Sequence, residues 1–282
     1  MAMWTATTVS ENANGAKEEN LGEYIMHHVQ NSNEWNIFGY HLQLPQFEPL
    51  NVLGMSIDLS ITNHTVMLFL SALILIVMFN LAFRKKEVVP KGFAAILEML
   101  VLFIRDDVAI ANLGVKDGRK FTPLIATFFF YILICNMLGL IPLFTTPTGN
   151  INVTAGLAIV TFMVGQIYGI KNNGFFGYFK GLIPGGVPGW LLPLMFVLEI
   201  MGLVAKHVAL IIRLFANMVA GHIVLFAFVG LIIIFKSYFI SPVSMGFAVF
   251  VYLLEILVAF IQAYVFTILS TLFIGMAIHQ DH

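Results

Sequence analysis

Charged residues are scarce in this 282-residue sequence: they make up 10% of the chain, against about 25% in a typical soluble domain. Hydrophobic residues reach 59%, and the formal net charge is only −1. This composition excludes a disordered chain, and the lack of a basic excess excludes a nucleic-acid-binding protein. It indicates an integral membrane protein with several spans.

Cysteine is nearly absent as well, because Cys135 is the only one. A single cysteine excludes an internal disulfide, a cysteine-ligated zinc site and a Cys-x-x-Cys redox pair. No Gly-Lys dipeptide occurs, which excludes a Walker A phosphate loop, and the G-x-S-x-G and H-E-x-x-H motifs are also missing. We therefore expect no catalytic site, bound nucleotide, metal or cofactor in this chain.

The N-terminal region differs in charge from the rest of the sequence. Acidic residues recur there against a single lysine, Lys17. We expect residues 1–62 to form a small extracytoplasmic segment ahead of a membrane domain at 63–282. Within that segment, 21–30 is predicted to be a short amphipathic helix and 35–47 a small hairpin.

Apolar runs separated by cations and polar turns fill the membrane domain. Residues 121–170 carry no formal charge, and the Thr/Pro/Gly-rich stretch 145–150 divides them into two spans. Lysines and arginines follow the first apolar run and flank this uncharged pair, which by the positive-inside rule puts those ends in the cytoplasm. The Gly/Pro-rich segment 174–189 is predicted to be a flexible cytoplasmic loop. The prediction is an all-α membrane protein with five crossings, N-terminus outside and C-terminus cytoplasmic, with spans at about 65–83, 121–144, 152–170, 190–235 and 242–279 and a charged cytoplasmic-surface helix at about 91–113.

The last two apolar segments are longer than a bilayer requires. If they are helical, 190–235 and 242–279 extend roughly 69 and 57 Å, whereas the hydrocarbon core is about 30 Å thick. Strong tilt or a break is required. Two strongly tilted helices would form a broad wall that suits contact with a large curved partner.

Arg213 is the sharpest functional signal because it lies in an otherwise apolar helix. A central arginine costs about 2.5–3.5 kcal/mol even on lenient insertion scales, and it cannot lose its charge. It therefore needs a carboxylate or a wet cavity, either as a structural ion pair or as a fixed charge in an ion path. Glu199, Lys206 and Arg213 are seven residues apart on one helical stripe. Asn217 joins this stripe, and small residues flank it: Ala209, Ala216 and Ala220.

Two titratable residues indicate a proton path. His222 lies nine residues after Arg213, on roughly the opposite face of the helix. Glu255 and Gln262 share a face of the final helix. If the two long helices run antiparallel, Gln262 lies near the depth of Arg213 and Glu255 near that of His222. A histidine and a carboxylate within an apolar span form a plausible proton relay.

These motifs together resemble subunit a of bacterial F-type ATP synthases. The stretch Ile212–His222 fits the family pattern R-L-F-x-N-M-x-A-G, and Glu199, Glu255 and Gln262 match its other polar positions. Motifs of the middle spans also fit, namely the run from Asn136 to Pro142 and the run from Pro147 to Thr154. Some members carry an acid after Ala-Gly and a histidine seven residues before the glutamine, so His222 and Glu255 are the same pair exchanged.

The resemblance implies a stator subunit in the cytoplasmic (inner) membrane that lies against a ring of c subunits, with b subunits as peripheral stalk. Protons would enter by one half-channel, ride the ring on c-subunit carboxylates and leave by a second, offset half-channel. Arg213 would separate the two and favour the ionised carboxylate. Glu255, His222, Asn217 and Gln262 would line the outer path, and Glu199 would belong to the inner one.

Two other functional classes remain open at this stage. A proton-coupled secondary transporter would show internal repeats with broken helices, and we find no convincing repeat. A membrane haem or quinone protein would use His64, His207 and His222, but the last two are 15 residues apart on one helix and cannot ligate one iron together. Visible absorbance of the purified chain would separate that class from the others.

Overall fold

The computed structural model describes residues 34–37, 40–43, 50–52, 55–57, 62–84, 90–141, 144–183, 188–235 and 240–279. Its strands form two short antiparallel hairpins: β1 (Glu34–Ile37) with β2 (Tyr40–Gln43), and β3 (Leu50–Val52) with β4 (Met55–Ile57). The first hairpin, 34–43, overlaps the stretch 35–47 that was predicted to form one and begins one residue earlier. The helix predicted over 21–30 lies outside the described residues.

Helices build the membrane domain. They are α2 (Asn63–Ala82), α3 (Phe93–Phe103), the π-helical η1 (Ile104–Ile110), α4 (Ala111–Gly139), the 3-10 turn η2 (Pro147–Gly149), α5 (Ile151–Asn173), α6 (Phe175–Gly181), the 3-10 turn η3 (Gly189–Leu191), α7 (Leu192–Phe235) and α8 (Ile240–Ile278). Among the described residues, five helical segments are long and apolar enough to cross a membrane: Asn63–Ala82, Phe93–Gly139, Ile151–Asn173, Gly189–Phe228 and Pro242–Ile278. The chain is an all-α membrane protein, as its composition predicts.

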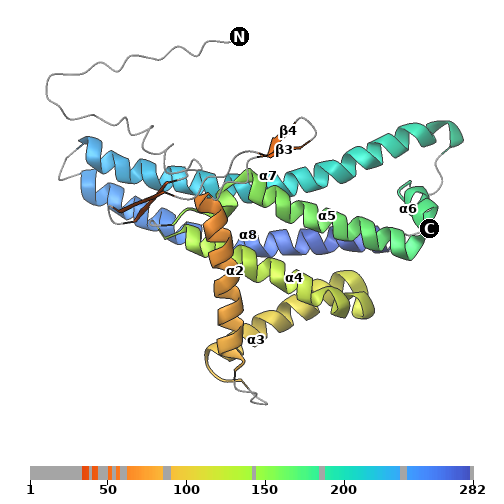
Figure 1. Ribbon diagram of the computed structural model, residues 1–282, viewed down its shortest axis with the longest axis horizontal. Coiled ribbons are helices and arrows are strands. Elements are labelled where there is room, and N and C mark those ends of the chain that lie inside the picture. Colours follow the sequence, from red (N-terminus) through yellow and green to blue (C-terminus); the bar gives the residue numbers. More distant parts are fainter. Residues whose placement is uncertain are drawn as a thin grey trace, which may run out of the picture.

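The two C-terminal helices are too long to cross a bilayer upright. α7 has 44 residues and α8 has 39, or about 66 and 58 Å at 1.5 Å per residue. By contrast, the 20 residues of α2 give about 30 Å, which matches the hydrocarbon core. Figure 1 shows α5, α7 and α8 running lengthwise while α2 crosses them steeply. If α2 stands upright in the bilayer, α7 and α8 are strongly tilted, as predicted.

The packed interior centres on α4, which contacts α2, η1 and α8. Its side chains Ile125 and Ile132 are completely buried. Phe128 meets Phe266 of α8 edge to face, with ring centroids 5.9 Å apart. Polar groups also join the helices, since the amide of Asn136 donates to the carbonyl oxygen of Ala259 on α8 at 3.3 Å. This packing fixes α8 against the middle of the domain.

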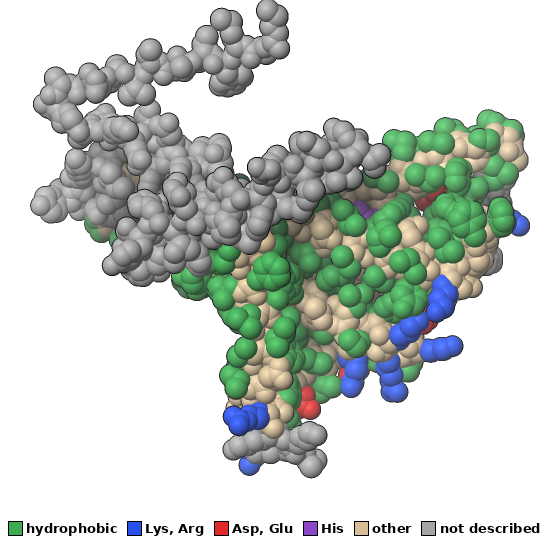
Figure 2. All heavy atoms as spheres, in the orientation of Figure 1, with side chains coloured by type: hydrophobic (Ala, Val, Ile, Leu, Met, Phe, Trp, Pro, Cys, Tyr) green, Lys and Arg blue, Asp and Glu red, His purple; other side chains and the backbone are tan. Residues whose placement is uncertain are grey.

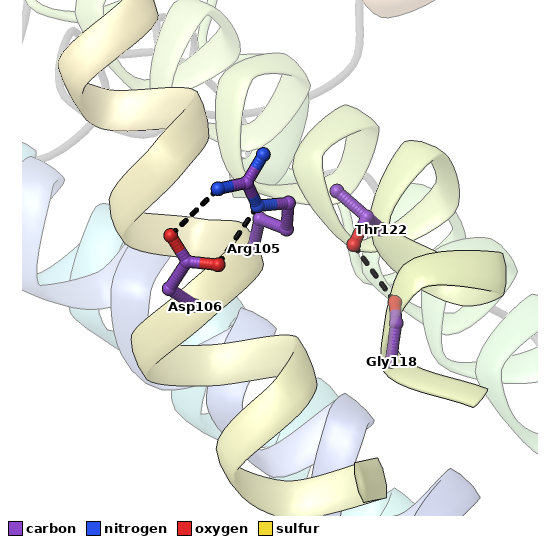
Figure 3. A network of polar contacts seen from close by, with 4 residues as sticks. All are labelled: Arg105, Asp106, Gly118 and Thr122. Carbon is purple, nitrogen blue, oxygen red and sulfur yellow. Dashed lines mark hydrogen bonds and ion pairs between the residues drawn. The ribbon is translucent and has the colours of Figure 1, made fainter. Parts of the chain in front are cut away.

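The charged segment before α4 packs as one arm of a helical hairpin. The chain reverses at Gly114, which has a φ of 75° within α4. A side chain at Gly118 would overlap the η1 backbone at Ile110, so the two arms approach closely. Figure 3 shows how η1 carries its charge: Arg105 donates two hydrogen bonds of 2.8 Å to the carboxylate of Asp106. The opposite charges of this half-exposed pair compensate each other on one face of η1, while the opposite face of η1 is buried.

The segment 174–189 was predicted to be a flexible loop, and this prediction is wrong for its first half. Residues 175–181 form α6, which is held in place by one buried aromatic side chain. Tyr178 is 1% exposed, and a side chain at Gly169 would overlap both the Tyr178 ring and the carbonyl oxygen of Ala277. The glycine therefore lets α6 fold back onto α5 and α8.

The outer surface of the isolated domain is strongly apolar. Large hydrophobic side chains are exposed on α2, α5, α7 and α8 as well as on shorter helices, among them Phe69, Ile76, Ile159, Ile167, Val204, Ile212, Leu253 and Leu257. Figure 2 shows this apolar surface and, along its lower and right-hand edges, most of the lysine and arginine side chains in view. Apolar area on this scale is covered by lipid or by other chains.

Candidate functional site

Arg213 lies on an exposed stripe of α7 rather than inside the domain. Its side chain is exposed, and so are the three flanking alanines and Asn217: Ala209, Ala216, Asn217 and Ala220. Among the described residues, no carboxylate forms an ion pair with Arg213. The described part of the chain therefore gives no support to an internal ion pair at Arg213, and its interpretation as a fixed charge in an ion path stays a prediction.

One turn beyond Arg213, a hydrogen bond joins α7 to α8. The Asn217 amide donates to Oε1 of Gln262 at 2.8 Å. Gln262 is 3% exposed, and its Nε2 is buried without a hydrogen-bond partner in the described chain. The two helices therefore run antiparallel with Gln262 near the depth of Arg213, as the spacing predicted.

A second contact between the same helices brings the titratable pair together. Nδ1 of His222 lies 4.0 Å from Oε1 of Glu255, and both side chains are largely buried. The two Glu255 carboxylate oxygens have no hydrogen-bond partner in the part of the chain that the structure describes. We refer to Thr146, Asn217, His222, Glu255 and Gln262 as the His222 cluster.

His222 touches more groups than the sequence revealed. Its Nδ1 lies 3.0 Å from the carbonyl oxygen of Met218, and its Nε2 lies 2.9 Å from both the carbonyl oxygen of Gly139 and the hydroxyl of Thr146. On the other side of Thr146, Nδ1 of His64 donates to the Thr146 carbonyl at 3.1 Å. A cavity of about 20 Å³ separates His64 from His222, which is room for roughly one water molecule.

Gly221 is a further residue that sequence reasoning missed. A Cβ at this position would overlap Oε1 of Glu255. The glycine next to His222 therefore leaves room for the carboxylate against α7. Its place in the Ala-Gly-His run was the available signal, since glycine in a helix often marks a close approach.

Glu199 and Lys206 do not join the His222 cluster but line a cavity at the other end of α7. This Glu199 cavity has a volume of about 240 Å³. Its polar lining comes from α5, α6 and α7 and from the residue after α8: Thr161, Gln166, Tyr178, Glu199, Lys206, His207 and His279. Glu199 is half-buried there. Along α7, a compact polar cluster thus lies beyond Arg213 and an open cavity lies before it.

Comparison with known proteins identifies the family. The model of the family described as ATP synthase A chain matches residues 65–275. The chain is 48% identical to ATP synthase subunit a of Chloroherpeton thalassium over 266 residues, which cover 91% of this chain and 77% of that protein. It is 50% identical to ATP synthase subunit a of Myxococcus xanthus over 234 residues, covering 80% and 77%, and 45% identical to that of Chlorobium phaeobacteroides over 280 residues, covering 96% and 79%.

The chain belongs to the ATP synthase subunit a family. The matched region contains most of α2, all of α3 to α7 and most of α8. It therefore includes the whole His222 cluster and most of the lining of the Glu199 cavity. The resemblance inferred from the arginine motif is confirmed, and the family membership agrees with the five apolar helices.

Proposed function

We propose that this chain is the proton-translocating stator subunit of a rotary ATP synthase, with Arg213 separating two half-channels that open onto a ring of c subunits. The observation that carries the proposal is the state of Arg213. Its guanidinium lies exposed on a membrane helix, and no carboxylate within the described residues pairs with it. Burial in lipid would cost about 2.5–3.5 kcal/mol even on the lenient scale.

A carboxylate on a neighbouring chain offsets that cost. The exposed Ala209, Ala216 and Ala220 allow another helix to approach closely on both sides of Arg213. A c-subunit carboxylate passing this stripe is held ionised by the guanidinium, so it releases its proton before Arg213 and accepts another beyond it. The fixed positive charge also repels protons and prevents a direct leak between the half-channels.

The polar groups on either side of Arg213 provide the two routes. Glu199 lies 14 residues before Arg213 and His222 nine residues after it, about 21 and 13 Å along the helix. The ports are therefore offset, and a proton has to travel with the ring to pass from one to the other. Each charge that crosses gains about 2.3 kcal/mol per 100 mV, which drives rotation.

His222 has a hydrogen-bond scheme for each of its charge states. A carbonyl oxygen only accepts, so Nδ1 carries a proton and donates to Met218. In the neutral ring, Nε2 accepts from the Thr146 hydroxyl and has to move away from the Gly139 carbonyl oxygen, which lies 2.9 Å from it in the structure and repels a bare lone pair. In the protonated ring, Nε2 donates to the Gly139 carbonyl instead, with the Glu255 carboxylate 4.0 Å from Nδ1. The ring is thus accommodated in both states, as a proton relay requires.

Water completes the path from Glu255 toward Arg213. The unpartnered oxygens of Glu255 and Nε2 of Gln262 are buried, and buried polar groups in native proteins are satisfied by ordered water when no protein partner is present. Asn217 holds the Gln262 amide in place on this route. The protonated Glu255 side chain passes its proton to water next to Gln262, and that water protonates the carboxylate of a c subunit.

The distribution of charge supports the proposed orientation. Exposed cations gather at the end of the domain that includes the α3–α4 hairpin and α6: Lys91, Lys116, Arg119, Lys120, Lys171 and Lys180. Figure 2 shows lysine and arginine side chains along this edge. By the positive-inside rule this edge faces the cytoplasm, so the His222 cluster serves the outer half-channel and the Glu199 cavity the inner one. The chain resides in a bacterial cytoplasmic membrane, where b subunits form the peripheral stalk.

The test compares inverted membrane vesicles carrying ATP synthase with this chain or with its Arg213→Ala variant. A proton gradient is imposed, and ATP synthesis is measured per assembled complex. We expect assembly to survive and synthesis to vanish. Lys171→Ala, which removes an exposed cation at the end of α5, is the matched control and is expected to synthesise normally. Normal synthesis by Arg213→Ala would overturn the proposal.

A further inference from the structure

The Glu199 cavity contains a second group able to carry a proton, and no part of the proposed function uses it. His207 on α7 lines this cavity together with Glu199 and Gln166. Along the helix, His207 lies eight residues from Glu199 and six from Arg213, or about 12 and 9 Å. It therefore lies at a depth between the acid at the cavity and the arginine.

The hydrogen bonds of His207 fix which nitrogen is available. Nδ1 lies 2.9 Å from the carbonyl oxygen of Leu203. Because a carbonyl only accepts, Nδ1 carries the hydrogen, and Nε2 of the neutral ring presents a lone pair. Nε2 is buried and has no hydrogen-bond partner among the residues that the structure describes. The ring thus carries a free basic nitrogen that is buried beside a cavity lined by the same residue.

Aromatic contacts hold the imidazole in this position. The ring of Phe162 on α5 meets it edge to face with centroids 5.1 Å apart, and the ring of Phe273 on α8 lies at the same centroid distance. Residues from three helices therefore fix the position of the imidazole ring, although Nε2 makes no hydrogen bond within the described residues. A histidine that served packing alone could be replaced here by a phenylalanine.

The cavity is large enough to connect the ring to Glu199 through water. A volume of about 240 Å³ holds several water molecules, since one occupies about 30 Å³ in the liquid. The titratable or charged groups that face it are Tyr178 from α6, Glu199 and Lys206 from α7, and His279 after α8; α5 contributes Thr161 and Gln166, which do not titrate. His279 is engaged by the Leu113 carbonyl at 3.3 Å and by Asp117 at 3.5 Å.

We propose that His207 is a proton-transfer residue of the inner half-channel, an inference that rests on the proposed function. Nε2 accepts the proton that a c-subunit carboxylate releases near Arg213. It then passes that proton through cavity water to Glu199 and the cytoplasm. One N–H bond forms and then breaks, and no other bond changes. When the motor runs in reverse, the same nitrogen delivers protons from the cytoplasm to the ring.

Inverted vesicles suit the test because their medium bathes the cytoplasmic side. Two substitutions separate proton transfer from structure: His207→Phe keeps a ring between Phe162 and Phe273, and His207→Gln keeps a polar group at the cavity wall. ATP synthesis and ATP-driven proton uptake are measured against medium pH, with the lumen buffered at constant pH. Assembly is checked in each case.

We expect both variants to lose about tenfold in rate. This loss is smaller than the ~10²–10⁴-fold typical of positioned acid–base groups, because cavity water offers a parallel route. The rate is also expected to lose the part of its pH dependence that falls between about pH 5 and 8, where histidine titrates. Imidazole added to the medium is expected to restore rate to His207→Ala, which leaves space for it, but not to His207→Phe.

Two results would overturn the inference: a normal rate in His207→Phe or His207→Gln, or a reduced rate with an unchanged pH profile, which would mean a structural role. The Arg213→Ala experiment keeps the two proposals distinguishable. If Arg213→Ala abolishes synthesis while the His207 variants run normally, only the role of His207 is wrong. If Arg213→Ala synthesises normally, the stator function itself fails.

Discussion

The two polar regions along α7 are built in opposite ways. In the His222 cluster, side chains from α7, α8 and the turn after α4 contact one another directly, and the adjoining cavity holds about 20 Å³. In the Glu199 cavity, the polar side chains surround a space of about 240 Å³. Under the proposed function, the first region would move a proton between fixed groups, whereas the second would move it mainly through water.

This difference predicts unequal sensitivity to mutation. A relay of contacting groups fails when one member changes, because no parallel route exists. A water-filled cavity tolerates the loss of one wall group, because the remaining water still conducts. The variants below test this contrast in order of decreasing expected effect.

Glu255→Gln is expected to have the largest effect. The amide has nearly the same size as the carboxylate but cannot exchange a proton at neutral pH, so ATP synthesis per assembled complex should fall about a hundredfold, as for loss of a positioned acid–base group. The measurement is synthesis in inverted vesicles under an imposed proton gradient. Glu98→Gln on α3 makes the same chemical change away from both regions and should leave the rate unchanged. A normal rate in Glu255→Gln would remove the carboxylate from the relay.

Gly221→Ala is expected to disturb the cluster through geometry alone. The added methyl group overlaps the Glu255 carboxylate, and overpacking of this kind costs about 1–3 kcal/mol, so synthesis should fall about tenfold. Gly202→Ala on the same helix is the matched control, because nothing lies within 4 Å of a Cβ there. Equal rates in the two alanine variants would show that the carboxylate is not confined as the structure shows.

Exchanging the two titratable residues should restore part of what either single change removes. We expect His222→Glu and Glu255→His each to lower synthesis strongly, and the double variant to recover most of the loss, because an acid and a base still face each other across α7 and α8. The four rates form a double-mutant cycle, in which contacting residues typically couple by about 0.5–3 kcal/mol. Additive losses would mean that the pair does not act as a unit.

Glu199→Gln is expected to have the smallest effect, a loss of only a few-fold. Water in the Glu199 cavity still reaches the other groups on its wall after the carboxylate is gone. The measurement is again synthesis per assembled complex, compared directly with Glu255→Gln. A loss as large as that of Glu255→Gln would contradict the contrast between the two regions.

The sequence predicted the elements with a strong signal and missed those that depend on tertiary contacts. The five apolar spans and the length of α7 and α8 followed from hydropathy, and the position of Gln262 near the depth of Arg213 followed from helical spacing once the two helices were taken as antiparallel. By contrast, α6 was predicted to be a loop, because a seven-residue helix between glycines has no periodic pattern and is stabilised by the burial of Tyr178 against α5 and α8.

The site shows the same division. His222 and Glu255 stand out as rare titratable residues in apolar helices, so their pairing could be inferred. Thr146 and Gly139 could not, because they lie on other segments and act through a hydroxyl and a backbone carbonyl. The free nitrogen of His207 was equally invisible, since only the structure shows that Nδ1 is occupied and Nε2 is not.

The continuity of α7 has a consequence for how the family can vary. Glu199, Arg213 and His222 all lie on one unbroken helix of 44 residues. The number of residues between them therefore sets both the distances along the helix and the directions in which the side chains point. Inserting one residue between Glu199 and Arg213 would lengthen that interval by only about 1.5 Å but rotate everything beyond it by about 100°. The arginine would leave the exposed stripe of α7, and His222 would turn away from Glu255. Substitutions can accumulate along such a helix, but its length between these residues is fixed.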